Sequence, residues 1–196
     1  MPSLVMSGRK YAESCFMENN MGNLITLGDD DFKMSNGLTD VFIDYMLISG
    51  SELAKTDSEK RLTAFLAECD QNYRGLGTIG FHIDKMPWDK ESFDADKRFM
   101  LGAIKHAREL TYDEKIWDML MYQPNHEHIE YALDGFERLI SKMCKADIKD
   151  DILKEWLHDY GNYGGSVKCL RHDTIMSVCG CKLCGDGCKD RHPITY

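Results

Sequence analysis

Long apolar segments are missing from this chain of 196 residues. A helix that spans a membrane needs about 20 consecutive apolar residues, and the sequence has no such run. Arg9 and Lys10 are not followed by the apolar stretch of a secretory leader, so we expect no cleavable leader. These absences predict a soluble protein with no membrane attachment, a cytoplasmic location and thiols that stay reduced.

Familiar catalytic and nucleotide-binding motifs are missing as well. The sequence contains no Gly-x-Ser-x-Gly nucleophile motif, no P-loop and no Gly-x-Gly-x-x-Gly fingerprint. Nucleophilic catalysis and phosphate binding by a glycine-rich loop therefore have no support in the sequence. The absence of these motifs favours a role other than catalysis.

Basic residues are outnumbered: 24 lysines and arginines face 33 aspartates and glutamates, for a net charge of −9. The imbalance is uneven, because the segment from Lys168 onward carries +2 and the preceding residues carry −11. An acidic body repels phosphate backbones, so a nucleic-acid partner is not expected. A basic protein is the favoured partner, although acidity also serves solubility alone.

What the sequence does contain is apolar residues at helical spacing, three or four residues apart. The segments that show this spacing are 41–48, 62–73, 93–107, 116–120, 129–143 and 148–160. They predict a mainly α protein, a bundle-like domain of five to six helices with one short strand near 77–84. An α+β fold is the alternative, and the lack of a fixed repeat argues against a solenoid.

Two Thr-x-x-Glu patterns predict capping boxes, in which each side chain bonds the other residue's free backbone N–H. They are Thr56 with Glu59 and Thr111 with Glu114. Two glycines follow Tyr73, so the helix that Thr56 opens is expected to end near that residue.

The organisation that we predict has two parts. Residues 1–166 form a mainly helical, acidic domain, irregular over 1–40 apart from a short strand at 24–27. Residues 167–196 form a Cys/His-rich C-terminal module, similar to a zinc knuckle, that packs on this domain.

Cysteine is the most informative residue type. Of the eight, five crowd between positions 169 and 188, whereas Cys15, Cys69 and Cys144 are scattered and are interpreted as core residues. In a reducing compartment, crowded cysteines bind metal more often than they form disulfides. Reduced, unliganded thiols and disulfides both remain open as alternatives.

The spacing within the C-terminal module predicts a zinc site. Zinc binds thiolate and imidazole tetrahedrally, and two ligands two residues apart reach one ion through a tight turn. Cys181 with Cys184 and Cys169 with His172 have this spacing and make a set of three thiols and one imidazole. Seven candidate ligands exceed the four that one ion takes. The alternates are Cys179, Cys188 and His192.

A catalytic zinc site is the competing hypothesis. Nucleobase deaminases combine a His-x-Glu sequence with a Pro-Cys-x-x-Cys sequence, the glutamate moving protons for a zinc-bound water. His128 and Glu130 have the first spacing, and Cys181 with Cys184 the second. Position 180 is Gly instead of Pro, and the strand–helix alternation of that fold is absent from the sequence.

The function predicted from these observations is binding: a protein-binding accessory protein with a structural zinc site, of the inhibitor or immunity type as one form. The alternative is a zinc-dependent hydrolase or deaminase-like enzyme that uses the C-terminal cysteines. Several aromatic residues fall in or beside predicted connections and can anchor an interface where they are exposed. These are Trp88, Phe93, Tyr112, Trp117, Tyr122 and Tyr163.

Overall fold

The structure, a computed structural model, describes residues 23–72, 75–160 and 167–184. It confirms a mainly α fold, with six α-helices and one two-stranded sheet among these residues. The helices are α2 (Asn36–Leu53), α3 (Asp57–Glu68), α4 (Phe93–Leu110), α5 (Glu114–Leu120), α6 (His126–Lys142) and α7 (Asp150–Tyr160). Short 3-10 helices are η3 (Ile83–Lys85), η4 (Lys145–Asp147) and η6 (Lys182–Cys184).

The described part of the N-terminal segment is more ordered than the sequence predicted. β1 (Leu24–Leu27) and β2 (Asp30–Lys33) form an antiparallel hairpin, and α2 already begins at Asn36. Irregularity up to residue 40 is therefore wrong for this part, while residues 1–22 lie outside the described chain. Gly28 takes a positive φ of 59° in the turn, which lets the two short strands reverse direction.

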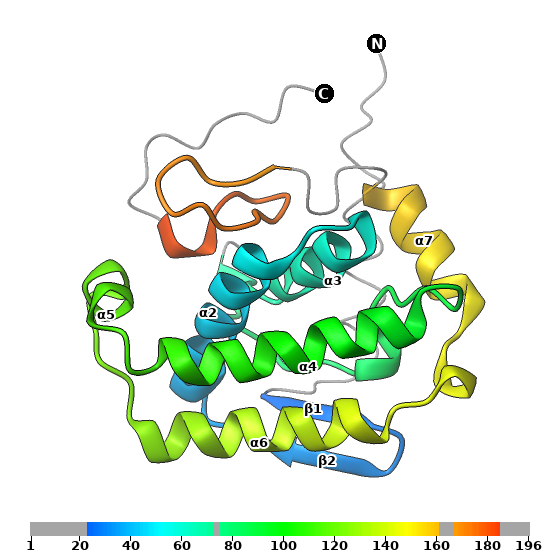
Figure 1. Cartoon of the computed structure of the whole chain (residues 1–196), viewed down its shortest axis with the longest axis horizontal. Helices are drawn as coiled ribbons and strands as arrows, with labels where there is room; N and C mark the ends of the chain where they lie inside the picture. The colour runs from blue at the N-terminus through cyan, green and yellow to red at the C-terminus, as the bar shows by residue number, and fades with distance from the viewer. Residues whose placement is uncertain (1–22, 73–74, 161–166, 185–196) are drawn as a thin grey trace.

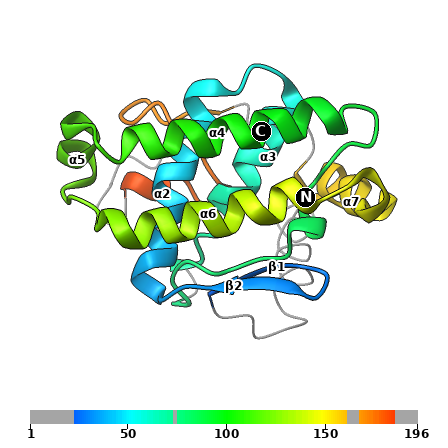
Figure 2. The same cartoon turned by 60° about the horizontal axis from the view of Figure 1, so that its bottom comes forward.

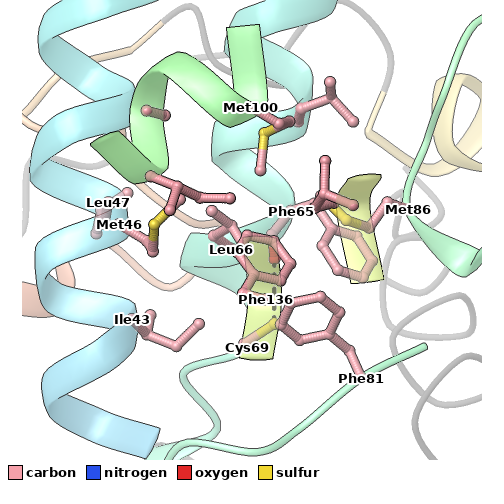
Figure 3. Close-up of a cluster of buried hydrophobic side chains, with 14 of the residues drawn as sticks. Ile43, Met46, Leu47, Phe65, Leu66, Cys69, Phe81, Met86, Met100 and Phe136 are labelled. Atoms are coloured by element: carbon pink, nitrogen blue, oxygen red, sulfur yellow. Dashed lines mark hydrogen bonds between the residues drawn. The ribbon is translucent and has the colours of Figure 1, made fainter. Parts of the chain in front are cut away.

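Four helices and the hairpin enclose the apolar core. α2 packs against both α3 and α4, α6 packs against α4 and α2, and the hairpin lies against α6 (Figures 1 and 2). Figure 3 shows aromatic, aliphatic and methionine side chains from these four helices meeting in one cluster with Phe81 and Met86, which flank η3. Phe136 of α6 stands edge-on to Phe42 and Phe81, with ring centroids 5.3 and 6.0 Å away. The body of the protein is thus held by ordinary apolar burial.

The strand expected at 77–84 is not a regular strand. Thr78 forms an isolated bridge with Asp70, and His82 forms a parallel one with Thr26 of β1, so the segment changes partner midway. η3 then begins at Ile83. Gly80 lies so close to β1 that a Cβ there would stand 2.1 Å from the carbonyl oxygen of Leu24. Phe81 and Ile83 are buried, so this part of the chain is an extended segment packed on the hairpin.

The two predicted capping boxes have different outcomes. The box at Thr56 and Glu59 is present, although α3 ends at Glu68 rather than near residue 73. The box at Thr111 and Glu114 is wrong: the side chain of Asp113 caps α5, and the Thr111 hydroxyl donates to a carbonyl of α4.

The scattered cysteines differ in their burial. Cys69, at the end of α3, is fully buried in the core, and its thiol donates to the Phe65 carbonyl (Figure 3). Cys144 is exposed, so its interpretation as a core residue is wrong. Cys15 lies outside the described residues.

Candidate metal centre

The first pair of candidate ligands sits in a tight reversal of the chain. Lys168 and Ile175 bridge across it, and the backbone N–H of Cys169 donates to the Thr174 carbonyl at 2.8 Å. Asp173 closes the reversal with a positive φ of 52°, a conformation that aspartate tolerates better than most residues. Cys169 and His172 therefore present their side chains to the same side of one turn.

A second tight turn supplies the other pair. Ser177 and Gly180 bridge each other, and Gly180 takes a φ of 111° that an L side chain rarely adopts. The chain then enters η6, where the N–H of Cys184 donates to the Cys181 carbonyl at 3.2 Å. This one turn of 3-10 helix brings Cys181 and Cys184 together.

The two turns bring the four predicted ligands together. The ligand atoms of Cys169, His172, Cys181 and Cys184 all lie within 4.8 Å of one another. His172 Nδ1 is 3.7 Å from the Cys169 sulfur and 3.5 Å from each of the other two sulfurs. The sulfurs of Cys169 and Cys184 are 3.7 Å apart, much farther than the roughly 2.05 Å of a disulfide bond. This group could hold a metal ion.

Four of the six separations within this group match the edges of a tetrahedral zinc site. With Zn–S bonds of about 2.3 Å and a Zn–N bond of about 2.1 Å, neighbouring sulfurs lie about 3.8 Å apart and sulfur lies about 3.6 Å from nitrogen. The sulfur–nitrogen separations of 3.5–3.7 Å and the sulfur–sulfur separation of 3.7 Å agree with both values.

The surroundings shift the pKa values of the candidate ligands in different directions. Burial opposes ionisation of Cys169, but hydrogen bonds from the backbone N–H groups of His172 and Arg171, together with those of the Cys181 and Cys184 thiols, outweigh it and lower the pKa of this thiol. Burial raises the pKa of the Cys181 thiol. Burial and the adjacent Arg171 lower the pKa of His172, so the imidazole is neutral at neutral pH and its nitrogen can bind a metal. A cation would favour the thiolate form of each cysteine.

Backbone hydrogen bonds fasten the module to the helical body. The N–H of Ile175 donates to the Ser51 hydroxyl of α2 at 2.8 Å, and the N–H of Val178 donates to the Glu68 carboxylate of α3 at 2.7 Å. The side chain of Ile175 is fully buried in the main core. Figure 1 shows the module, coloured orange to red, lying beside α2 and α3.

Lys182, which lies between Cys181 and Cys184 in the sequence, forms a buried ionic anchor to α2. The side chain of Lys182 is only 5% exposed, and its Nζ lies 2.6 Å from Asp44 Oδ1 and 2.7 Å from Asp40 Oδ1, both on α2. The other oxygen of Asp44 accepts the Tyr122 hydroxyl at 2.9 Å. Burial opposes the charge, but Asp44 and Asp40 outweigh it and raise the pKa of Lys182, so its ammonium stays protonated.

This anchor was missed by sequence reasoning. The available signal was Asp44, an acid on a helical segment whose neighbours Phe42, Tyr45 and Met46 are all buried. A buried carboxylate needs a cationic or hydrogen-bonding partner, yet nothing in the sequence indicates that the partner is a lysine 138 residues away.

The remaining predicted site residues do not join the group. Cys179 is not among the four, and its N–H donates to the Ser177 hydroxyl. Cys188 and His192 lie outside the described residues. Glu130 forms an ion pair with Arg108 of α4, and the group of possible metal ligands found among the described residues contains neither Glu130 nor His128. The structure therefore does not bring His128 and Glu130 to the cysteines.

Comparison of the chain with protein families, with curated proteins and with solved structures found no match. Within the described ranges, no helix has the length and apolar character needed to cross a membrane.

Proposed function

We propose that this is a zinc-binding protein in which the ion is structural and folds the C-terminal module onto the helical body. The observation that carries the proposal is the agreement between the ligand separations and the edges of a tetrahedral zinc site. Three thiols and one imidazole fill all four positions, which is typical of structural zinc, whereas catalytic sites keep one position for water.

Metal analysis of paired cysteine variants tests this proposal. We expect the wild-type chain to carry one zinc ion and Cys184→Ser to lose it, because three ligands bind more weakly than four. Cys144→Ser is the matched control, since Cys144 is exposed and outside the group. A wild-type chain without zinc, or a Cys184→Ser variant that keeps it in full, contradicts the proposal.

The structural role is tested separately from binding. A strong chelator is expected to make Cys169 and Cys181 reactive to a thiol reagent, while the far-ultraviolet circular dichroism of the helical body persists. Thiols that stay protected after zinc removal would contradict a structural ion. X-ray absorption at the zinc edge is expected to show three sulfurs and one nitrogen. An oxygen ligand from water would favour the alternative, a zinc-dependent hydrolase or deaminase-like enzyme.

We propose further that the protein works by binding a basic protein, in the cytoplasm, as an accessory or inhibitory partner. The net charge of −9 supports this, since complementary charge steers association and is weakened by salt. In a pull-down, basic partners are expected to elute as salt is raised. Partners that bind with no salt dependence, or no partner at all, would contradict this part of the proposal.

A further inference from the structure

The surface around α5 combines exposed apolar side chains with acidic ones. Tyr112 is 60% exposed and Met121 is 91% exposed, the highest fraction among the exposed large hydrophobic residues of the described chain. The two flank α5, a helix of seven residues in which only Ile116 is buried. Figures 1 and 2 show α5 at one end of the molecule, beyond the main stack of helices.

Three aromatic rings gather there. The ring of Tyr112 stacks on His126, with centroids 4.3 Å apart and planes 5° from parallel, and Trp117 lies 6.2 Å from the same imidazole. The indole N–H of Trp117 donates to the Thr111 carbonyl, which fixes its orientation. Since His126 covers one face of the Tyr112 ring and the residue is still 60% exposed, the other face is open to a ligand. We call Tyr112, Trp117, Met121 and His126 the α5 surface.

The charge around this surface is predominantly negative. Residues 109–127 contain five acids and one lysine, and all of these side chains are at least partly exposed. The acids are Glu109, Asp113, Glu114, Asp118 and Glu127, and the base is Lys115. A second copy of the chain would bring these acids against each other, which is unfavourable. A basic segment would instead meet complementary charge.

The base of the surface is fixed to the body. Tyr122 directly follows Met121, and its hydroxyl donates to Asp44, the carboxylate that also accepts Lys182 of the metal-ligand turn. Met121 takes a positive φ of 63° at the end of α5, and its amide donates to the Trp117 carbonyl. These hydrogen bonds restrict the motion of the segment that carries the exposed side chains, which lowers the conformational entropy lost when a partner binds.

We propose that the α5 surface is the site at which this protein binds an arginine-rich segment of its basic partner. The inference rests on the proposed function, since it locates the binding of that partner. A guanidinium stacks on the open face of Tyr112, where cation–π attraction and the nearby carboxylates both favour it. Met121, unbranched and polarisable, adapts to the apolar side chains of the segment.

The probe for the test is a 16-residue peptide of arginine and leucine at helical spacing, with the matched glutamate–leucine peptide as its charge control. Trp117 is the built-in reporter, because the other tryptophans, Trp88 and Trp156, are each 1% exposed. We expect saturable binding of the arginine peptide with a change in tryptophan emission, and no binding of the glutamate peptide. Amide NMR shifts are expected to gather in residues 109–127.

Two tyrosines form the matched pair of variants. Tyr112→Ala is expected to raise the Kd of the arginine peptide about tenfold, the equivalent of about 1.4 kcal/mol. Tyr131→Ala removes another exposed tyrosine, 52% exposed on α6, and is expected to change the Kd less than twofold. Unchanged circular dichroism would show that both variants keep their fold, so that a change in Kd reports on binding.

The failures are distinguishable. If the wild-type chain does not bind the arginine peptide, the basic partner itself is contradicted. If it binds but Tyr112→Ala weakens binding no more than Tyr131→Ala does, only the α5 surface is contradicted. A dimer seen in sedimentation that Met121→Ser dissociates would also overturn the inference, because a second copy would then occupy the surface.

Discussion

α2 and the described part of the C-terminal module are both eighteen residues long, yet they are ordered differently. α2 buries eleven of its residues, and its backbone is satisfied by helical hydrogen bonds. Residues 167–184 bury five, and their longest regular element is the three-residue η6. The module has too little apolar surface to form a core of its own, so it needs cross-links.

Those cross-links are of two kinds. One is internal, the zinc ion that we propose for the group of four side chains from its two turns. The other is external: the bonds to Ser51 and Glu68 and the ion pairs of Lys182. The body and the module should therefore respond to different perturbations, the body to cavities and the module to loss of charge or metal.

The largest effect is expected from a cavity in the body. Phe136 is fully buried between Phe42 and Phe81, so Phe136→Ala should lower the free energy of unfolding by about 3–5 kcal/mol. Tyr131→Ala, on the same helix but half exposed, should cost about 1 kcal/mol or less. Denaturation followed by circular dichroism measures both. Similar losses in the two variants would show that the body is not held by apolar burial.

The second-largest effect is expected from removal of the ionic anchor. This change distinguishes the external cross-links from the internal one. Lys182→Met leaves Asp44 buried without its cation, and we expect a loss of about 3 kcal/mol. Addition of Asp44→Asn should recover part of it, since the amide needs no cation and can still accept the Tyr122 hydroxyl. Zinc content should stay at one per chain in both.

Lys154→Met is the control for this prediction, because Lys154 is exposed on α7. Denaturation and metal analysis are the measurements. If Lys182→Met loses zinc as well as stability, ligation and docking are one event, and the distinction between internal and external cross-links fails.

A smaller effect is expected at the helix starts of the body. The Glu59 carboxylate accepts from the N–H groups of Lys55 and Thr56 at 2.7 and 2.8 Å, so Glu59→Ala should cost about 1 kcal/mol. Glu114→Ala should cost less than about 0.5 kcal/mol, because the side chain of Asp113 caps α5. Equal losses measured by denaturation would contradict the different capping of α3 and α5.

The sequence was informative where the determinants are local. Helical spacing predicted the mainly α fold, and the two-residue gaps in the C-terminal module named the four side chains that the structure brings together. A capping box depends on four consecutive positions, which is why Thr56 with Glu59 was predicted correctly. Thr111 and Glu114 have the same Thr-x-x-Glu pattern. However, α5 begins two residues later than this pattern predicts, and Asp113 is its N-cap residue.

Contacts between distant segments could not be predicted in this way. The expected strand at 77–84 depends on what lies beside it, and the close approach of Gly80 to Leu24 is set by the whole fold. The same holds for Lys182 and Asp44, because a buried ion pair needs only two residues and leaves no spacing to recognise. The hairpin lies in a polar stretch, and its order comes from packing against α6.

The smallest effect is expected from acid, which should separate the two regions along the pH axis. Asp30 of β2 forms ion pairs with Lys142 and Arg138 of α6, and these lower its pKa from 3.8 to about 2. Because the folded pKa is the lower one, the stabilisation is complete above pH 3.8 and is lost as the pH falls towards 2. Thiolate and imidazole ligands take up protons at higher pH, so zinc should leave first.

Circular dichroism and a zinc indicator follow the two events. Asp30→Asn should flatten only the body's response below pH 3.8, and Asp118→Asn, an exposed control, neither curve. Coincident transitions in the wild-type chain would mean that body and module unfold as one unit.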